Sequence, residues 1–182
     1  MTAYIGFLEK DTYVYEAIRN PFIKLMSMRA MQESAAALSD EHGMPLQKIL
    51  GHVEDLLYRF GNRALGDTVE KVGKDPVRKL SSNDRLVGSL NLSLQHGGKP
   101  VFICLGIAAA LHFSMSGDQS SERVQKVISN EGPEAAFEEI CGLDAKHHAM
   151  VWIVDFYNMI RSGMTFTEIL AKAEHMKNAL MR

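Results

Sequence analysis

The chain has 182 residues, about the length of one domain, and its 46% hydrophobic and 23% charged residues exclude a disordered or low-complexity protein. The net charge of −2 gives no reason to expect nucleic acid as a partner. The longest apolar run, 101–113, is too short to span a bilayer. Residues 1–11 lack the basic region and the long apolar region of a signal peptide, so we do not expect them to be one. The two cysteines form no CxxC pair, so neither a disulfide framework nor a zinc site is indicated. These features predict a cytoplasmic protein without a membrane partner.

Apolar residues recur with helical spacing nearly throughout the chain. Asn20-Pro21 predicts a helix start, and Gly43 can end that helix after about His42 in a left-handed conformation. The next helix carries one apolar stripe, which consists of Ile49, Leu50, Val53, Leu56, Leu57 and Phe60.

Similar patterns follow in the second half of the chain. Gly97-Gly98 ends another helix, and stripes at 150–160 and 166–180 predict two more. Thr165 and Glu168 have the spacing of a capping box. The β-branched runs lie inside longer helical patterns, so we predict an all-α domain over 1–182, a multi-helical bundle with about eight or nine helices.

Several chemistries are excluded by the motifs. Gly61-x4-Gly66 resembles the start of a phosphate-binding loop but lacks the required lysine, and no dinucleotide-binding G-x-G-x-x-G follows a strand. His147 and His148 are adjacent, so their rings diverge on a helix and predict no metal pair. His112 and Cys104 lie in the apolar run, where we expect a histidine bonded to backbone and an inert thiol. No catalytic residue and no metal site is therefore assigned.

One segment breaks the helical rhythm. Between Arg59 and Arg85, here called the basic segment, seven basic and four acidic residues are mixed with Gly, Pro, Ser and Asn. Its net charge is +3, whereas the rest of the chain carries −5. A cationic loop on a rigid scaffold is suited to an anionic small ligand. The alternative interpretation is a solvated loop with scattered charges.

The basic segment also carries a resemblance to a known family. The stretches 62–69 (NRALGDTV), 72–81 (VGKDPVRKLS) and 83–88 (NDRLVG) are similar to the C-terminal domain of the polyol-specific long-chain dehydrogenases, and among them to the mannitol-1-phosphate 5-dehydrogenases. Further similar stretches occur at 2–6 (TAYIG), 33–38 (ESAAAL), 106–113 (GIAAALHF) and 142–144 (GLD). The resemblance implies a helical domain of the type found at the C-terminus of 6-phosphogluconate-dehydrogenase-like enzymes.

This family oxidises a sugar alcohol with NAD and without metal, for example mannitol 1-phosphate to fructose 6-phosphate. Its NAD-binding Rossmann domain precedes the helical domain and ends in a catalytic helix with Lys, then Asn five residues later, then His. No lysine of this chain has an asparagine five residues downstream. The resemblance therefore implies a substrate-binding domain without the NAD-binding domain, inactive alone. Its expected partners are a sugar-alcohol phosphate and either a separate Rossmann domain or a second copy of itself.

The resemblance further implies which residues bind substrate. In the family, the positions of Lys71 and Lys79 contact substrate hydroxyls, while Lys74, Arg78 and Arg85 are candidates for the phosphate. Lysine stands at 71 and 74, where the family more often has arginine. Asn83 is a further candidate, with an N-cap of the following helix as the alternative. We expect the five cations to converge on one concave site. We also expect apolar surface, which the Rossmann domain would cover, near Tyr4, Phe7, Leu8 and Phe113.

Two alternatives to this function remain open. The first is the same domain of a hexuronate reductase, acting on fructuronate or tagaturonate. The second is a non-catalytic helical module that binds a sugar phosphate or a protein partner.

Overall fold

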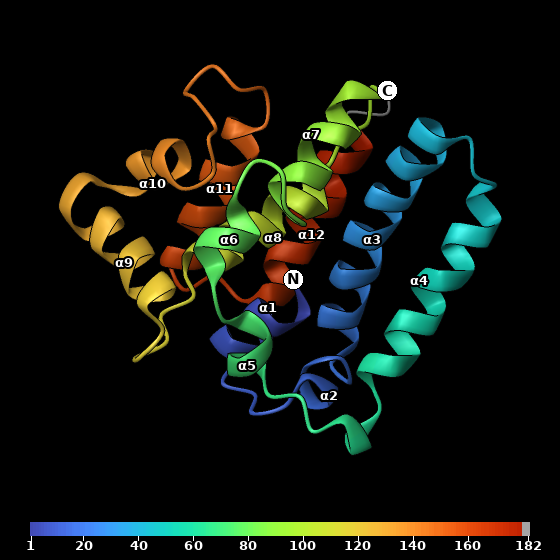
Figure 1. The fold of residues 1–182 in the computed structure, drawn as a ribbon, viewed down its shortest axis with the longest axis horizontal. Helices are drawn as coiled ribbons and strands as arrows, with labels where there is room; N and C mark the ends of the chain where they lie inside the picture. The colour runs from blue at the N-terminus through green and yellow to red at the C-terminus, as the bar shows by residue number, and fades with distance from the viewer. Residues whose placement is uncertain (180–182) are drawn as a thin grey trace.

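A computed structural model describes residues 1–179 and confirms the all-α prediction: this part of the chain holds helices and no strand (Figure 1). The only β-type pairing in it is an isolated bridge between Tyr13 and Thr68. The helices are α1 (Thr2–Leu8), α2 (Val14–Ala17), α3 (Pro21–His42), α4 (Leu46–Phe60), the 3-10 helix η1 (Arg63–Leu65), α5 (Val69–Gly73), α6 (Pro76–Leu80), α7 (Val87–Gln95), α8 (Val101–Leu111), α9 (Gln119–Glu131), α10 (Pro133–Glu139), α11 (Met150–Arg161) and α12 (Phe166–Ala179).

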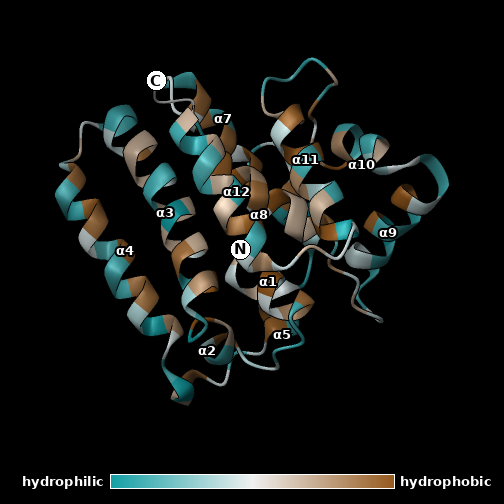
Figure 2. Ribbon diagram, turned by 180° about the vertical axis from the view of Figure 1, so that it is seen from behind, coloured by the Kyte–Doolittle hydropathy of each residue, from teal (hydrophilic) through white to brown (hydrophobic). Residues whose placement is uncertain are grey.

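The centre of the fold is α8, every residue of which is buried. It packs against α1, α3, α6, α7, α11 and α12. An apolar helix that other helices surround needs no polar face, and Figure 2 shows its hydrophobic colour between the more polar outer helices. The pair α3–α4 lies on one side of this centre and the pair α9–α10 on the other (Figure 1). Within the described helices, none combines the length and the apolar character that crossing a bilayer requires.

The predicted helix ends are confirmed where they depend on local chemistry. The Asn20 side chain accepts a hydrogen bond from the Phe22 amide at 3.0 Å, and Gly43 ends α3 at a φ of 62°. At the start of α12, the Glu168 carboxylate accepts from the Thr165 amide while the Glu168 amide donates to the Thr165 hydroxyl. These bonds satisfy helix-end amides that have no partner inside the helix.

The predicted count of eight or nine helices is wrong, because the described chain contains twelve α-helices. The missed ones are short, and four to seven residues are too few to show an apolar stripe. Two of them, α5 and α6, lie in the basic segment that the sequence predicted as irregular. The stripe on α4 is also less buried than expected: Val53 and Leu57 are buried, whereas Leu56 is 40% exposed. Leu180, placed in the last predicted helix, lies outside the described residues.

The predicted apolar face near the N-terminus is not exposed. Tyr4 and Phe113 are buried and pack edge to face, with ring centroids 5.5 Å apart. Phe7 lies against Phe113 at 4.6 Å and is partly buried. Tyr4 and Phe113 thus belong to the core of this chain, and Phe7 and Leu8 are partly buried against it.

His112 and the cysteines behave as predicted. The Nε2 of His112 lies 3.0 Å from the Tyr157 carbonyl oxygen, and burial lowers the pKa of its ring. Cys104 and Cys141 are buried and unpaired. Burial raises the pKa of both thiols, that of Cys141 to about 12, so neither is a reactive thiolate.

A buried ion pair ties α8 to its neighbours. The Glu33 carboxylate on α3 accepts hydrogen bonds from the amides of Phe102 and Ile103, both at 3.0 Å, and lies 2.7 Å from the Lys177 ammonium on α12. Lys177 also donates to the Lys99 carbonyl. Burial raises the pKa of Glu33, and the Lys177 charge opposes that rise. The carboxylate thus caps the start of α8 and links α3 to α8 and α12.

Candidate functional site

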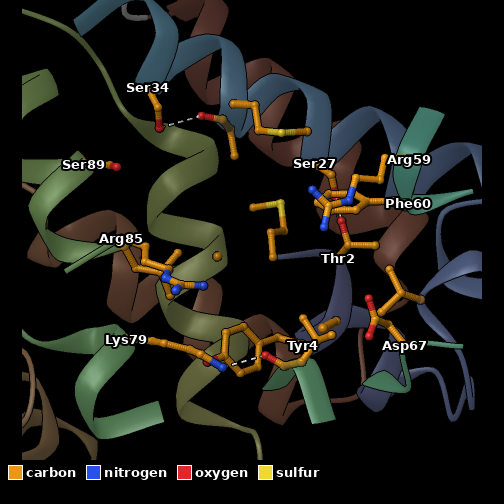
Figure 3. A pocket seen from close by; sticks show the side chains of 18 of the residues that line it. Thr2, Tyr4, Ser27, Ser34, Arg59, Phe60, Asp67, Lys79, Arg85 and Ser89 are labelled. Atoms are coloured by element: carbon orange, nitrogen blue, oxygen red, sulfur yellow. Dashed lines mark hydrogen bonds between the residues drawn. The ribbon is translucent and has the colours of Figure 1, made fainter. Parts of the chain in front are cut away.

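A pocket of about 360 Å³ lies between the start of α1, the middle of α3, the end of α4 and the basic segment. Its far side is formed by α8, at Ile103 and Gly106. Figure 3 shows its charged side chains at two ends: Arg59 and Asp67 at one, Lys79 and Arg85 at the other. This volume is in the usual range of small-molecule sites. We call it the central pocket.

Lys79 is the most unusual cation of the central pocket, because it is only 8% exposed. Its ammonium donates to the Val72 carbonyl at 2.6 Å and to the Lys74 carbonyl. Burial lowers its pKa, and the positive charges of Arg85 and Arg78 lower it further. An ammonium has three N–H donors, so one remains after these two bonds for a ligand oxygen.

Arg85 is held at the same end of the pocket by an acidic neighbour. Its Nε lies 3.4 Å from Asp84 Oδ1, while the other oxygen of Asp84 lies 3.2 Å from Arg78 Nη1. Arg78 in turn donates from Nε to Asp75 at 2.7 Å. The side chain of Asp75 raises the pKa of Arg78, and that hydrogen bond lowers the pKa of Asp75. Arg78 therefore has two carboxylate partners, whereas most of the Arg85 donors have no partner among residues 1–179.

The expected convergence of five cations is met by only two of them. Lys79 and Arg85 line the central pocket, while Lys71, Lys74 and Arg78 do not. Lys71 is 70% exposed and paired with Asp67 at 3.1 Å. Lys74 is exposed at the end of α5. The basic segment is wound into short helices, so its successive cations point in different directions.

Asn83 does not cap the following helix, so that alternative is wrong. The N-cap of α7 is Leu86, and no side chain caps it. Asn83 instead lines a second hollow that adjoins the central pocket.

Sequence reasoning missed the polar residues that α1, α3, α4 and α7 contribute to the site. Arg59 lies in the last turn of α4, shortly before the motif at 62–69, and its positive charge was the available signal. The Thr2 and Ser27 hydroxyls bond to each other at 2.7 Å in the wall of the pocket. Ser34 and Ser89 line its other end. Small hydroxyl residues in helices carry no sequence signal that separates a pocket wall from an ordinary surface.

The basic segment takes its shape from local caps. Side chains of Asn62, Thr68 and Asp75 accept amide hydrogen bonds at the starts of η1, α5 and α6. Asp75 has a φ of 59°, a left-handed conformation that aspartate tolerates better than most residues. At Gly73, a Cβ would lie 2.6 Å from the Phe113 ring. The absent side chain lets α5 pack directly on the core, which places Val72 and Lys79 at the pocket.

Comparison with known families agrees with this arrangement. A family model described as the mannitol dehydrogenase C-terminal domain matches residues 1–176. The chain belongs to this mannitol dehydrogenase C-terminal domain family. The match includes the whole basic segment and every residue that lines the central pocket. It also agrees with the resemblance found from the sequence motifs.

The structure of this mannitol dehydrogenase C-terminal domain also bears on cofactors. In residues 1–179, no group of three or more His, Cys, Asp or Glu side chains is placed to hold a metal ion. Rossmann-type NAD sites lie at the carboxyl ends of parallel strands, and the described residues contain only helices. The residues present therefore do not fit a dinucleotide of that binding mode.

Proposed function

We propose that this chain is the substrate-binding domain of an NAD-dependent polyol-phosphate dehydrogenase, which converts mannitol 1-phosphate to fructose 6-phosphate. The proposal rests on one observation: the buried ammonium of Lys79 lies in the wall of a small-molecule pocket and has one N–H left for a ligand. The family match supports a polyol as the substrate. The hydride acceptor and the general base would come from a separate nucleotide-binding domain.

The role of this chain is to bind and orient the sugar alcohol. The remaining N–H of Lys79 donates to a hydroxyl of the polyol, and the hydroxyls of Thr2 and Ser27 offer further partners. The apolar side chains of Phe60 and Ile103 exclude water from the carbon chain of the ligand. Holding one hydroxyl in a fixed position aligns the neighbouring C–H bond for hydride removal.

The proposal is tested by titrating the purified chain with mannitol 1-phosphate, mannitol and fructuronate in a calorimeter. We expect mannitol 1-phosphate to bind most tightly. Preference for fructuronate would favour a hexuronate reductase domain instead. If none of the three ligands binds, the proposal is contradicted.

A matched pair of variants locates the site. Lys79→Gln and Lys71→Gln each remove one positive charge from the basic segment, but only Lys79 lines the pocket. We expect Lys79→Gln to weaken mannitol 1-phosphate about tenfold or more, since a hydrogen bond from a charged donor is lost. Lys71→Gln should leave the affinity nearly unchanged. Circular dichroism and thermal melting of both variants check that they fold.

A further inference from the structure

A second hollow of about 520 Å³ adjoins the central pocket and is more open to solvent. It lies between α3, α7 and the turn at 82–85, and its lining is mostly hydroxyl and amide side chains. Three residues line both hollows: Ser34, Arg85 and Ser89. They come from α3, from the turn before α7, and from α7 itself. Figure 3 shows their side chains at one end of the central pocket.

The three side chains offer hydrogen-bond donors to a ligand at this junction. The Arg85 guanidinium has five N–H donors, and its ion pair with Asp84 uses Nε alone. Within residues 1–179, the Ser89 hydroxyl has no hydrogen-bond partner, and the Ser34 hydroxyl donates to the Ala30 carbonyl of its own helix at 3.2 Å. That carbonyl keeps its helical partner if Ser34 turns toward a ligand.

The charges around the junction favour an anion. Lys79 and Arg85 stand at the same end of the central pocket, and the Arg85 charge lowers the pKa of Lys79. The carboxylate beside Arg85 is Asp84, and Asp84 is shared with Arg78. A bound anion would offset the repulsion between Lys79 and Arg85, because a nearby negative charge stabilises the charged form of both side chains.

We propose that Ser34, Arg85 and Ser89 form an anion-binding site at this junction, which takes the phosphate group of the polyol phosphate. The site rests on the proposed function for the identity of its ligand. Arg85 binds two phosphate oxygens through its planar fork, and the two serine hydroxyls bind the others. The carbon chain then extends into the central pocket past Lys79. The open second hollow leaves the phosphate partly hydrated.

This assignment separates the candidate phosphate cations that the sequence could not tell apart. Arg78 is committed to Asp75 and Asp84, and Lys74 lines neither hollow. Arg85 is the candidate that lines both. The two serines add uncharged donors from α3 and α7, outside the basic segment, so the charge of that segment could not indicate them.

The test titrates the full chain with three probes: mannitol 1-phosphate, mannitol and inorganic phosphate. The variants are Arg85→Gln, the double variant Ser34→Ala with Ser89→Ala, and the control Lys74→Gln, which removes an exposed charge of the same segment. We expect Arg85→Gln to weaken both phosphate-containing probes about tenfold or more and to leave mannitol unchanged. The double serine variant should act in the same direction by about threefold to tenfold. Lys74→Gln should change none of the three affinities.

Other outcomes overturn the proposal and also identify what failed. If wild-type chain binds mannitol 1-phosphate but Arg85→Gln and Lys74→Gln weaken it equally, the anion site is wrong and the proposed function stands. If inorganic phosphate binds and depends on Arg85, but no polyol phosphate binds more tightly, the anion site stands and the proposed function fails. If no probe binds to the wild-type chain, both are wrong.

Discussion

Helix α8 and the basic segment are held in place by different forces. All eleven residues of α8 are buried, and its sequence is a nearly unbroken apolar run. The basic segment, by contrast, is mostly exposed and folds into three short helices, each of which a polar side chain caps. Burial of apolar area stabilises the first, whereas local hydrogen bonds and ion pairs shape the second.

The contrast separates stability from binding in this domain. Substitutions in α8 remove contacts of the core, so their main effect is on the free energy of unfolding. Substitutions in the basic segment change charges and caps at the pocket, so their main effect is on ligand affinity. The two regions meet where Gly73 packs on Phe113 and where Lys79 reaches the pocket.

The largest loss of stability is expected for Leu105→Ala. Leu105 is fully buried in α8, and truncation leaves a cavity, so the free energy of unfolding should fall by about 2–5 kcal/mol. Urea denaturation measures this loss. The matched control is Leu65→Ala in the basic segment, where the side chain is 42% exposed and the expected change is within about 0.5 kcal/mol. Equal losses for the two variants would break the comparison.

A second loss is expected from the polar cap of α8. Glu33→Ala removes the acceptor of two α8 amides and leaves Lys177 without its buried partner, so we expect a loss of about 3 kcal/mol. Glu33→Gln keeps one oxygen as an acceptor and should lose less. Thermal and urea denaturation of both variants provide the measurement. A larger loss for Gln than for Ala would contradict the capping role.

A smaller loss is expected from a cap in the basic segment. The Thr68 hydroxyl accepts the Lys71 amide at 3.1 Å, so Thr68→Ala should lower the free energy of unfolding by about 1 kcal/mol. Thr68→Ser keeps the acceptor and serves as the control. Hydrogen exchange of α5 amides should speed up in the Ala variant while that of α8 amides changes far less. Uniform acceleration in both helices would show that the two regions unfold as one unit.

The smallest effect concerns pH. Burial lowers the pKa of His112 below its usual 6.5, so the unfolded chain takes up a proton first as the pH falls. The stability that neutral His112 contributes is complete above pH 6.5 and is lost as pH falls from 6.5 through the lowered pKa of the folded state. His112→Asn should reduce the slope of stability against pH between 7 and 5. Urea denaturation at several pH values between 7 and 5 measures this slope, and a wild-type slope in the variant would contradict the effect of His112.

The sequence predicted the long helices, which have a periodic apolar stripe or capping residues at their ends. The helix that Asn20 opens and Gly43 closes was predictable, because both ends have chemical signals within a few residues. The family was predictable as well, because its motif is long and continuous. The helices α5 and α6 were not, since a helix of five residues shows no stripe.

The composition of the pocket was only partly predictable. Lys79 and Arg85 stand out by charge, and both line the central pocket. Lys71 and Arg78 carry the same charge but do not line the central pocket. The short helices α5 and α6 direct them instead to carboxylates, Lys71 to Asp67 and Arg78 to Asp75 and Asp84. Ser34 and Ser89 join the pocket through the packing of α3 and α7, and long-range packing leaves no mark on the residues themselves.

The bonds of Lys79 have a consequence for order in the basic segment. Its ammonium donates to the carbonyls of Val72 and Lys74 at the end of α5, so the Lys79 side chain connects α6 to α5 across the turn between them. A ligand oxygen that accepts the third N–H of Lys79 is therefore bonded to the same ammonium that connects the two helices. Ligand binding and the Lys79 bonds between α5 and α6 are then thermodynamically linked, so each makes the other more favourable.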